Sequence, residues 1–187
     1  MTFGTFEFTE YGTKPFVDVY SYGVTIPVTG VTVDINDANG KGITLVEGMI
    51  QPVAEYRPEF SLRDSADLNI RNVQYRMRRS GTTSTYNQSN SDKVRLANHN
   101  IDNSDTEGIH FQLWFKFGEN NSSNPYEDIS FHWRALAFVE GDSSAGLAAE
   151  EGQGRVKDSG DVGKARFTMS SDSIANYRIR CFNFLSS

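Results

Sequence analysis

The chain has 187 residues, of which 37% are hydrophobic and 22% charged, with a formal net charge of −6 and a single cysteine, Cys181. This composition excludes a disordered chain, and the length suits one domain with its own hydrophobic core. The acidic balance argues against binding to duplex nucleic acid, which normally requires a basic face, and one cysteine excludes an intrachain disulfide.

Membrane association and export through a classical signal are not expected either. No apolar run approaches the roughly 20 residues that a membrane helix needs. Residues 1–16 lack the basic region followed by an apolar region that marks a signal peptide. We therefore expect a protein that is made in the cytoplasm without a signal peptide and has no membrane partner.

Alternation of apolar and polar residues predicts strands along most of the chain, because successive side chains of a strand point to opposite faces. In the first part of the chain, the pattern predicts a short strand at 5–10 and one or two strands at 14–28. Residues 30–37 and 43–53 are predicted to form a hairpin around the turn formers at 38–42.

The rest of the chain continues in the same way. Further strands are expected at 68–77 (with a bulge near Asn72), 92–98, 108–118, 129–140, 164–169 and 176–185. Helix signal is limited to one or two turns at about 145–151 and a 3₁₀ turn at 171–177.

Nine or ten strands in a chain of this length predict an all-β, single-domain antiparallel β-sandwich over 1–187, jelly-roll-like in build. A closed β-barrel is the alternative. Two polar segments, at about 79–107 and 141–163, are expected to be long loops. Loops of that length are either functional or disordered, and neighbouring subunits could hold them in place.

The hairpin formed by 108–118 and 129–140 holds both tryptophans and two of the three histidines. Its expected register places His110 opposite Leu136 and His132 opposite Trp114. The two imidazoles then lie roughly 13 Å apart along the ladder. One zinc ion, with ligands about 2 Å from the metal, does not bridge that distance.

Trp114 is the residue of this hairpin most suspected of outside contact. It lies on the polar face, whereas Trp133 lies on the apolar face and is expected in the core. Beside His132 and near Tyr126 in the loop, Trp114 is a candidate anchor for a protein partner or platform for a sugar ring. The plainer interpretation is that it packs under a crossing loop.

The second group of contact candidates is the basic cluster of Arg76, Arg78 and Arg79. On a strand, Arg76 and Arg78 share one face and Arg79 lies on the other. The cluster is interpreted as a charged edge strand or as a contact with an acidic surface of a neighbouring subunit, such as one bearing Glu150, Glu151 and Asp158. Nucleic acid is the less favoured partner.

No catalytic, cofactor or metal motif is present in the sequence, so we expect no enzyme activity, cofactor or bound metal. The segment 34–42 has the carboxylates and amides of a calcium loop, but Ile35 stands where the pattern needs Asp or Asn. Cys181 alternates with apolar residues and is expected to be a buried hydrophobe.

Two classes of function remain. The first is a non-enzymatic structural protein, a virus or bacteriophage virion component (capsid, decoration or tail subunit) that contacts itself or other structural subunits. The alternative is a carbohydrate- or protein-binding module of lectin-like type that uses aromatic residues such as Tyr86, Tyr126 and Trp114.

Overall fold

The computed structural model describes twelve strands and no helix within residues 16–21, 27–35, 42–64, 66–70, 73–79, 85–101, 108–117, 129–138, 147–156, 162–171 and 173–184. In chain order the strands are β1 (Phe16–Ser21), β2 (Val31–Asp34), β3 (Gly42–Pro52), β4 (Pro58–Asp64), β5 (Val73–Arg79), β6 (Thr85–Ser91), β7 (Val94–Arg95), β8 (Ile109–Phe117), β9 (Ser130–Phe138), β10 (Leu147–Val156), β11 (Val162–Met169) and β12 (Ile174–Phe184).

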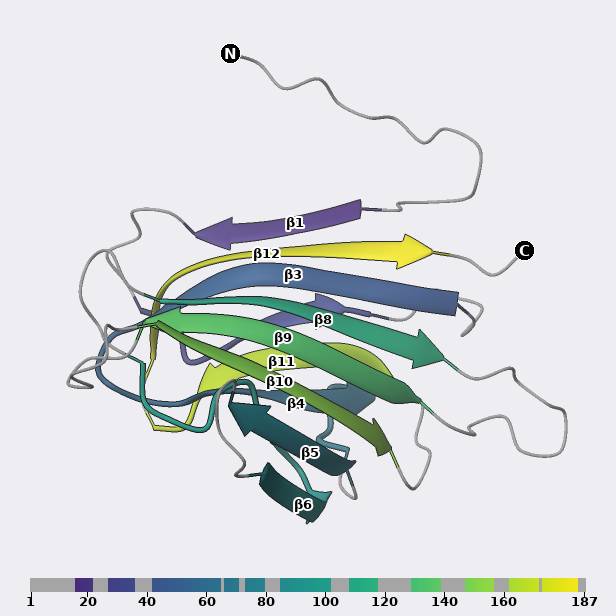
Figure 1. Ribbon diagram of the computed structural model, residues 1–187. Coiled ribbons are helices and arrows are strands. Elements are labelled where there is room, and N and C mark those ends of the chain that lie inside the picture. Colours follow the sequence, from purple (N-terminus) through teal and green to yellow (C-terminus); the bar gives the residue numbers. More distant parts are fainter. Residues whose placement is uncertain are drawn as a thin grey trace, which may run out of the picture.

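The strands form two sheets, and all their pairings are antiparallel. The larger sheet has the order β1-β12-β3-β8-β9-β10-β5-β6, and the smaller one has the order β2-β11-β4-β7. Figure 1 shows the long, twisted strands of the larger sheet side by side, with the smaller sheet stacked against one face. The predicted all-β antiparallel sandwich is therefore confirmed. The alternative of a closed barrel is wrong, because the two sheets have separate edges.

Aromatic rings fill the space between the sheets. Phe60 of the smaller sheet makes edge-to-face contacts with three rings of the larger one, at centroid distances of 5.6 to 6.2 Å. Those three are Phe115, Phe131 and Trp133. Each such pair contributes about 0.5–1.5 kcal/mol beyond the area that it buries. The core is thus built from the apolar faces that the alternation predicts.

Two single-residue expectations for the core are confirmed. Trp133 is buried, and its Nε1 donates a hydrogen bond to the Leu96 carbonyl at 3.2 Å. Cys181 is buried too; removal from water, helped by the nearby Asp34 charge, raises the pKa of its thiol to about 12.

The predicted register of the β8–β9 hairpin is also confirmed. His110 lies opposite Leu136 and Trp114 lies opposite His132. Along β8 the side chains alternate between buried and accessible, as a strand with one face on the core requires.

The hairpin predicted from 30–37 and 43–53 is wrong, although both of its strands exist. β2 pairs with β11 in the smaller sheet, whereas β3 pairs with β8 and β12 in the larger one. Each strand has one apolar face, and the two faces are buried from opposite layers, so the chain crosses between sheets. A hydrogen bond of 2.7 Å from Thr44 Oγ1 to the Ile35 carbonyl links the two segments.

The predicted helix at 145–151 is wrong as well, because Leu147–Val156 is strand β10. The polar segment at 79–107 contains β6 and β7. The expected 3₁₀ turn at 171–177 is replaced from Ile174 onward by β12, and β4 was not predicted.

Two further expectations concern strand ends. The strand predicted at 68–77 begins only at Val73, and its pairing with β6 shifts register between Val73 and Tyr75. Asn72 and the strand predicted at 5–10 lie outside the described residues.

Candidate ligand-binding trough

A broad trough of about 1210 Å³ crosses the outer face of the larger sheet. Its floor runs over six neighbouring strands, from β12 through β3, β8, β9 and β10 to β5. The side chains that project from this face into the trough are Arg180, Arg178, Glu47, Met49, His110, Gln112, Arg134, Leu136, Ala149, Glu151 and Arg78.

One line of polar residues crosses the whole trough; we call it the transverse row. Strand by strand, its members lie directly opposite one another in the ladder. They are Arg180, Glu47, Gln112, Arg134, Glu151 and Arg78. With about 4.8 Å between strands, the row is about 24 Å long. Since every strand contributes a residue of the same face, the sheet itself fixes the spacing of these groups.

Ion pairs close the row at both ends. Arg78 binds one carboxylate oxygen of Glu151 through both Nε and Nη2, each at 2.6 Å. At the other end, Arg180 Nη1 lies 3.5 Å from Glu47 Oε1. Both pairs are solvent-accessible and add little stability, but they hold the four side chains in place.

The centre of the row is different. Arg134, Gln112 and the neighbouring His110 are exposed, and none of them has a hydrogen bond or ion pair with another residue in the described part of the chain. Met49 and Leu136 flank His110 in the next row of the ladder and give that side an apolar floor. Uncommitted donors beside apolar surface are typical of a small-molecule site.

Trp114 and His132 lie beside the transverse row, one position further along β8 and β9 on the same face. Their rings are stacked, with centroids 4.7 Å apart and an interplanar angle of 8°. Their predicted contact is therefore confirmed. Because His132 covers one face of the indole, only the opposite face or the ring edge remains for a partner. Tyr126 lies outside the described residues.

The arginine cluster divides as its strand position predicts. Arg76 and Arg78 are exposed on the outer face. Arg79 lies opposite Glu150, on the inner side of the ladder. Within the chain, the acidic partner of Arg78 is Glu151, and the expected contact of the arginines with a neighbouring subunit stays a prediction. Asp158 lies outside the described residues.

Glu150 is the one buried charged residue of β10, with 2% of its surface exposed. His99 Nδ1 lies 2.9 Å from Glu150 Oε1, and the Asn98 N–H donates to the same oxygen at 3.4 Å. These contacts tie the segment after β7 to the first half of β10. A buried carboxylate needs such partners, because its charge is otherwise unsolvated.

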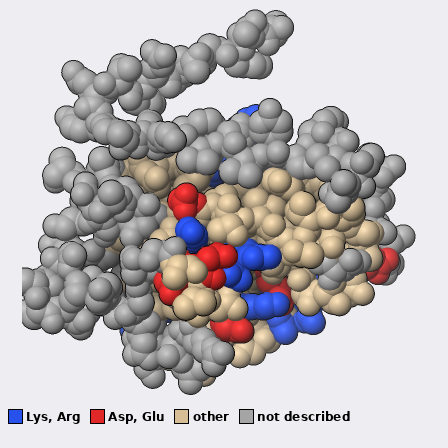
Figure 2. All heavy atoms as spheres, turned by 180° about the vertical axis from the view of Figure 1, so that it is seen from behind, with Lys and Arg blue, Asp and Glu red and all other residues tan. Residues whose placement is uncertain are grey.

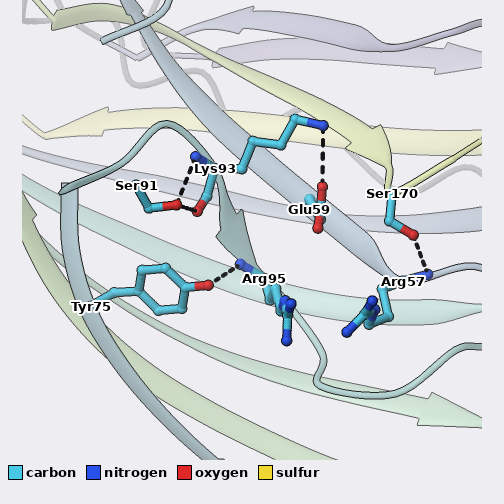
Figure 3. Close-up of polar contacts among 7 residues, drawn as sticks. All are labelled: Arg57, Glu59, Tyr75, Ser91, Lys93, Arg95 and Ser170. Atoms are coloured by element: carbon cyan, nitrogen blue, oxygen red, sulfur yellow. Dashed lines mark hydrogen bonds and ion pairs between the residues drawn. The ribbon is translucent and has the colours of Figure 1, made fainter. Parts of the chain in front are cut away.

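Further contacts fix the segment on either side of β7, as Figure 3 shows. Lys93 Nζ lies 3.4 Å from Glu59 Oε2, and the Arg95 N–H donates to the Tyr75 hydroxyl at 3.4 Å. Burial raises the pKa of Tyr75 well above its ordinary value. Tyr86 lies in strand β6 rather than in a loop, packs against Tyr75 and lies under the Arg95 guanidinium, and its expected contact with a ligand stays a prediction.

The opposite side of the molecule has no comparable arrangement in its described part. Figure 2 shows basic and acidic side chains interspersed over one region of that side. On the smaller sheet, opposite charges face each other across neighbouring strands, with Asp34 paired in the ladder with Lys164 and Glu59 with Arg95. Charges of mixed sign do not form a field that attracts a polyanion.

Sequence reasoning missed the centre of the trough. Gln112, Arg134 and Glu47 are ordinary polar members of alternating strands, and nothing in the sequence shows that they align. Their alignment becomes apparent only when the pairing registers of β3, β8, β9 and β10 are combined. Of the predicted contact residues that the structure describes, only Arg78 and Arg79 line the trough.

Comparisons with known proteins add little. No family model matches the chain, and no curated protein matches it in sequence. A solved structure of the galectin LEC-6 from Caenorhabditis elegans is similar at a TM-score of 0.27 and 16% identity, over 82% of this chain and 96% of that one. Similarity at this level carries no argument about function.

Within the described residues, no group of three His, Cys, Asp or Glu side chains is arranged to hold a metal ion. The same part of the chain contains no helix with the length and apolar character needed to cross a membrane.

Proposed function

We propose that this protein is a carbohydrate-binding module that holds an oligosaccharide in the trough and performs no chemistry on it. The observation that carries the proposal is the transverse row, in which donors and acceptors alternate over a rigid sheet. The predicted alternative, a lectin-like binding module, thus becomes the favoured one.

The chemistry of the row suits a sugar. Each sugar hydroxyl both donates and accepts a hydrogen bond, so its best partners are planar groups with several donors or acceptors. The row offers guanidinium, carboxylate and amide groups, while Met49 and Leu136 provide apolar surface for the C–H faces of a pyranose ring. At about 1210 Å³ the trough exceeds the usual range of about 300–1,000 Å³ for small-ligand pockets, which favours an extended ligand.

The spacing of the carboxylates supports binding without hydrolysis. Glu47 and Glu151 are three strands apart in the ladder, which places their backbones about 14 Å from each other. Glycosidases need their two carboxyl groups within about 5–9.5 Å. Each glutamate is also paired with an arginine.

The virion subunit remains a prediction with weaker motivation. It is motivated by a strand-rich single domain without a recognised catalytic motif and by long polar segments that neighbours would have to hold. Of those two segments, 79–107 contains β6 and β7, and 141–163 contains β10.

The test is a glycan array probed with the full chain, followed by calorimetry on the saccharide bound best. Gln112→Ala is expected to weaken binding about three- to tenfold, since it removes one hydrogen-bonding side chain from the trough. Gln153→Ala is the matched control, because Gln153 is exposed on the same face but outside the trough. An array without any bound saccharide, or equal affinities of the two variants, contradicts the proposal.

A further inference from the structure

We infer that the saccharide bound in the trough is acidic, and that its carboxylate binds Arg134 at the centre of the transverse row. This inference rests on the proposed function and adds the ligand's charge. Neither the composition of the chain nor its net charge of −6 suggests an anionic ligand. The placement of charged side chains on this one face does suggest one.

The described lining of the trough is locally basic, in contrast to the acidic chain as a whole. Its lining contains five arginines and three glutamates, which leaves an excess of two positive charges. Two of those residues, Arg79 and Glu150, lie on the inner side and balance each other. The excess therefore belongs to the outer face, where a ligand would lie. Walls of low dielectric strengthen such a local field.

Arg134 is the arginine best placed to use this excess. Arg78 and Arg180 each have a carboxylate partner within the row. Arg134 has none among the described residues, although Glu151 is its direct neighbour in the ladder; that carboxylate is paired with Arg78 instead. An exposed guanidinium with a free edge binds a carboxylate through two parallel hydrogen bonds.

The residues around Arg134 define a site for one carboxylate rather than for a polyanion. Gln112 lies directly opposite Arg134 on β8, and His110 is the next residue on the same face of that strand, so both offer N–H donors beside the guanidinium. Glu151 and Glu47 lie one and two strands away and repel additional negative charge. A sugar with a single carboxylate fits this pattern better than a heavily sulfated chain or a nucleic acid.

The experiment compares saccharides that differ only in the acidic group. The full chain is titrated with the carboxylated saccharide that it binds best on the array, and with the same saccharide after reduction of its carboxyl group to an alcohol. We expect reduction to weaken binding at least tenfold, as loss of a charge-assisted bidentate contact does. The Arg134→Gln variant is expected to bind both forms with nearly equal, weak affinity. Arg134→Lys should retain part of the preference.

Arg76→Gln is the matched control, since Arg76 is exposed on the same face and outside the trough. It should keep the full preference for the acid. Stronger binding of neutral or sulfated saccharides, or of a single-stranded oligonucleotide, would overturn the inference. Binding of neutral saccharides would leave the proposed function intact, whereas an array with no bound saccharide would remove both.

Discussion

Two glycines explain why the sequence of strand β10 predicts a helix. Gly152 and Gly154 are directly opposite Trp133 and Phe131 on β9, and the rings of those residues lie over them. The apolar volume that a strand normally supplies at alternate positions comes here from its neighbour. With no apolar period left, the Ala and Glu residues at 148–151 favour a helix on propensity alone. The wrong helix prediction thus has a cause at the level of single residues.

The same geometry predicts the effect of one added methyl group. A Cβ at Gly152 would overlap the six-membered ring of Trp133, which is itself fully buried. Gly152→Ala is therefore expected to lower the free energy of unfolding by about 1–3 kcal/mol, the usual range for overpacking. Urea unfolding followed by tryptophan fluorescence measures the change. Gln153→Ala, one residue away and exposed, should stay within about 0.5 kcal/mol; equal effects would show that the overlap does not matter.

The strands that the sequence predicts well are those in which apolar residues recur at every second position. β8, β9 and most of β11 carry a clear alternation of buried and accessible residues, as does β12 from Arg178 to Phe182, and all four strands were expected close to their observed positions. β6, at the edge of the larger sheet, has the sequence TYNQSNS and shows no such period. An edge strand needs only one apolar face or none. The structure of β6 is therefore decided by its pairing with β5 and not by its own sequence pattern. Pairing between distant strands is also what creates the trough.

The segment between β7 and Ile101 is held to the sheet by a contact between His99 and the buried Glu150. His99→Ala removes the 2.9 Å partner of Glu150, whose side chain is only 1% exposed. We expect a loss of about 1–3 kcal/mol in unfolding free energy, because the carboxylate keeps its burial and loses a hydrogen bond. Hydrogen exchange should speed up at the Leu96 and Ile101 amides, which bond to the Pro58 and Tyr56 carbonyls.

The control for this variant is His110→Ala, because His110 is exposed on the outer face and has no polar partner among the described residues. Its stability and amide exchange should match those of the unmodified chain. If the two histidine variants behave alike, the buried pair does not anchor the segment.

Whether the whole molecule acts as a binding module or as an assembly subunit depends on whether its surface offers an apolar patch for contact with other subunits. The large exposed hydrophobic side chains of the described residues are Ile43, Leu68, Leu136 and Phe184. Only Ile43 and Phe184 are neighbours in one ladder; Leu136 lies in the trough, and Leu68 follows β4. A stable interface buries about 1,200–2,000 Å² around an apolar centre, which these scattered residues do not provide.

We therefore predict that the purified chain is a monomer of 20.9 kDa. Light scattering after size-exclusion chromatography measures this mass directly, at a range of protein concentrations and with the array-selected saccharide present or absent. A monomer whose mass is unchanged by saccharide agrees with one trough per chain. A trimer, ring or closed particle would instead revive the virion subunit, and Trp114 and the exposed Arg76 would then be the first residues to replace in search of its interface. The measurement separates the two functions because the trough needs one copy of the chain, whereas a shell needs many.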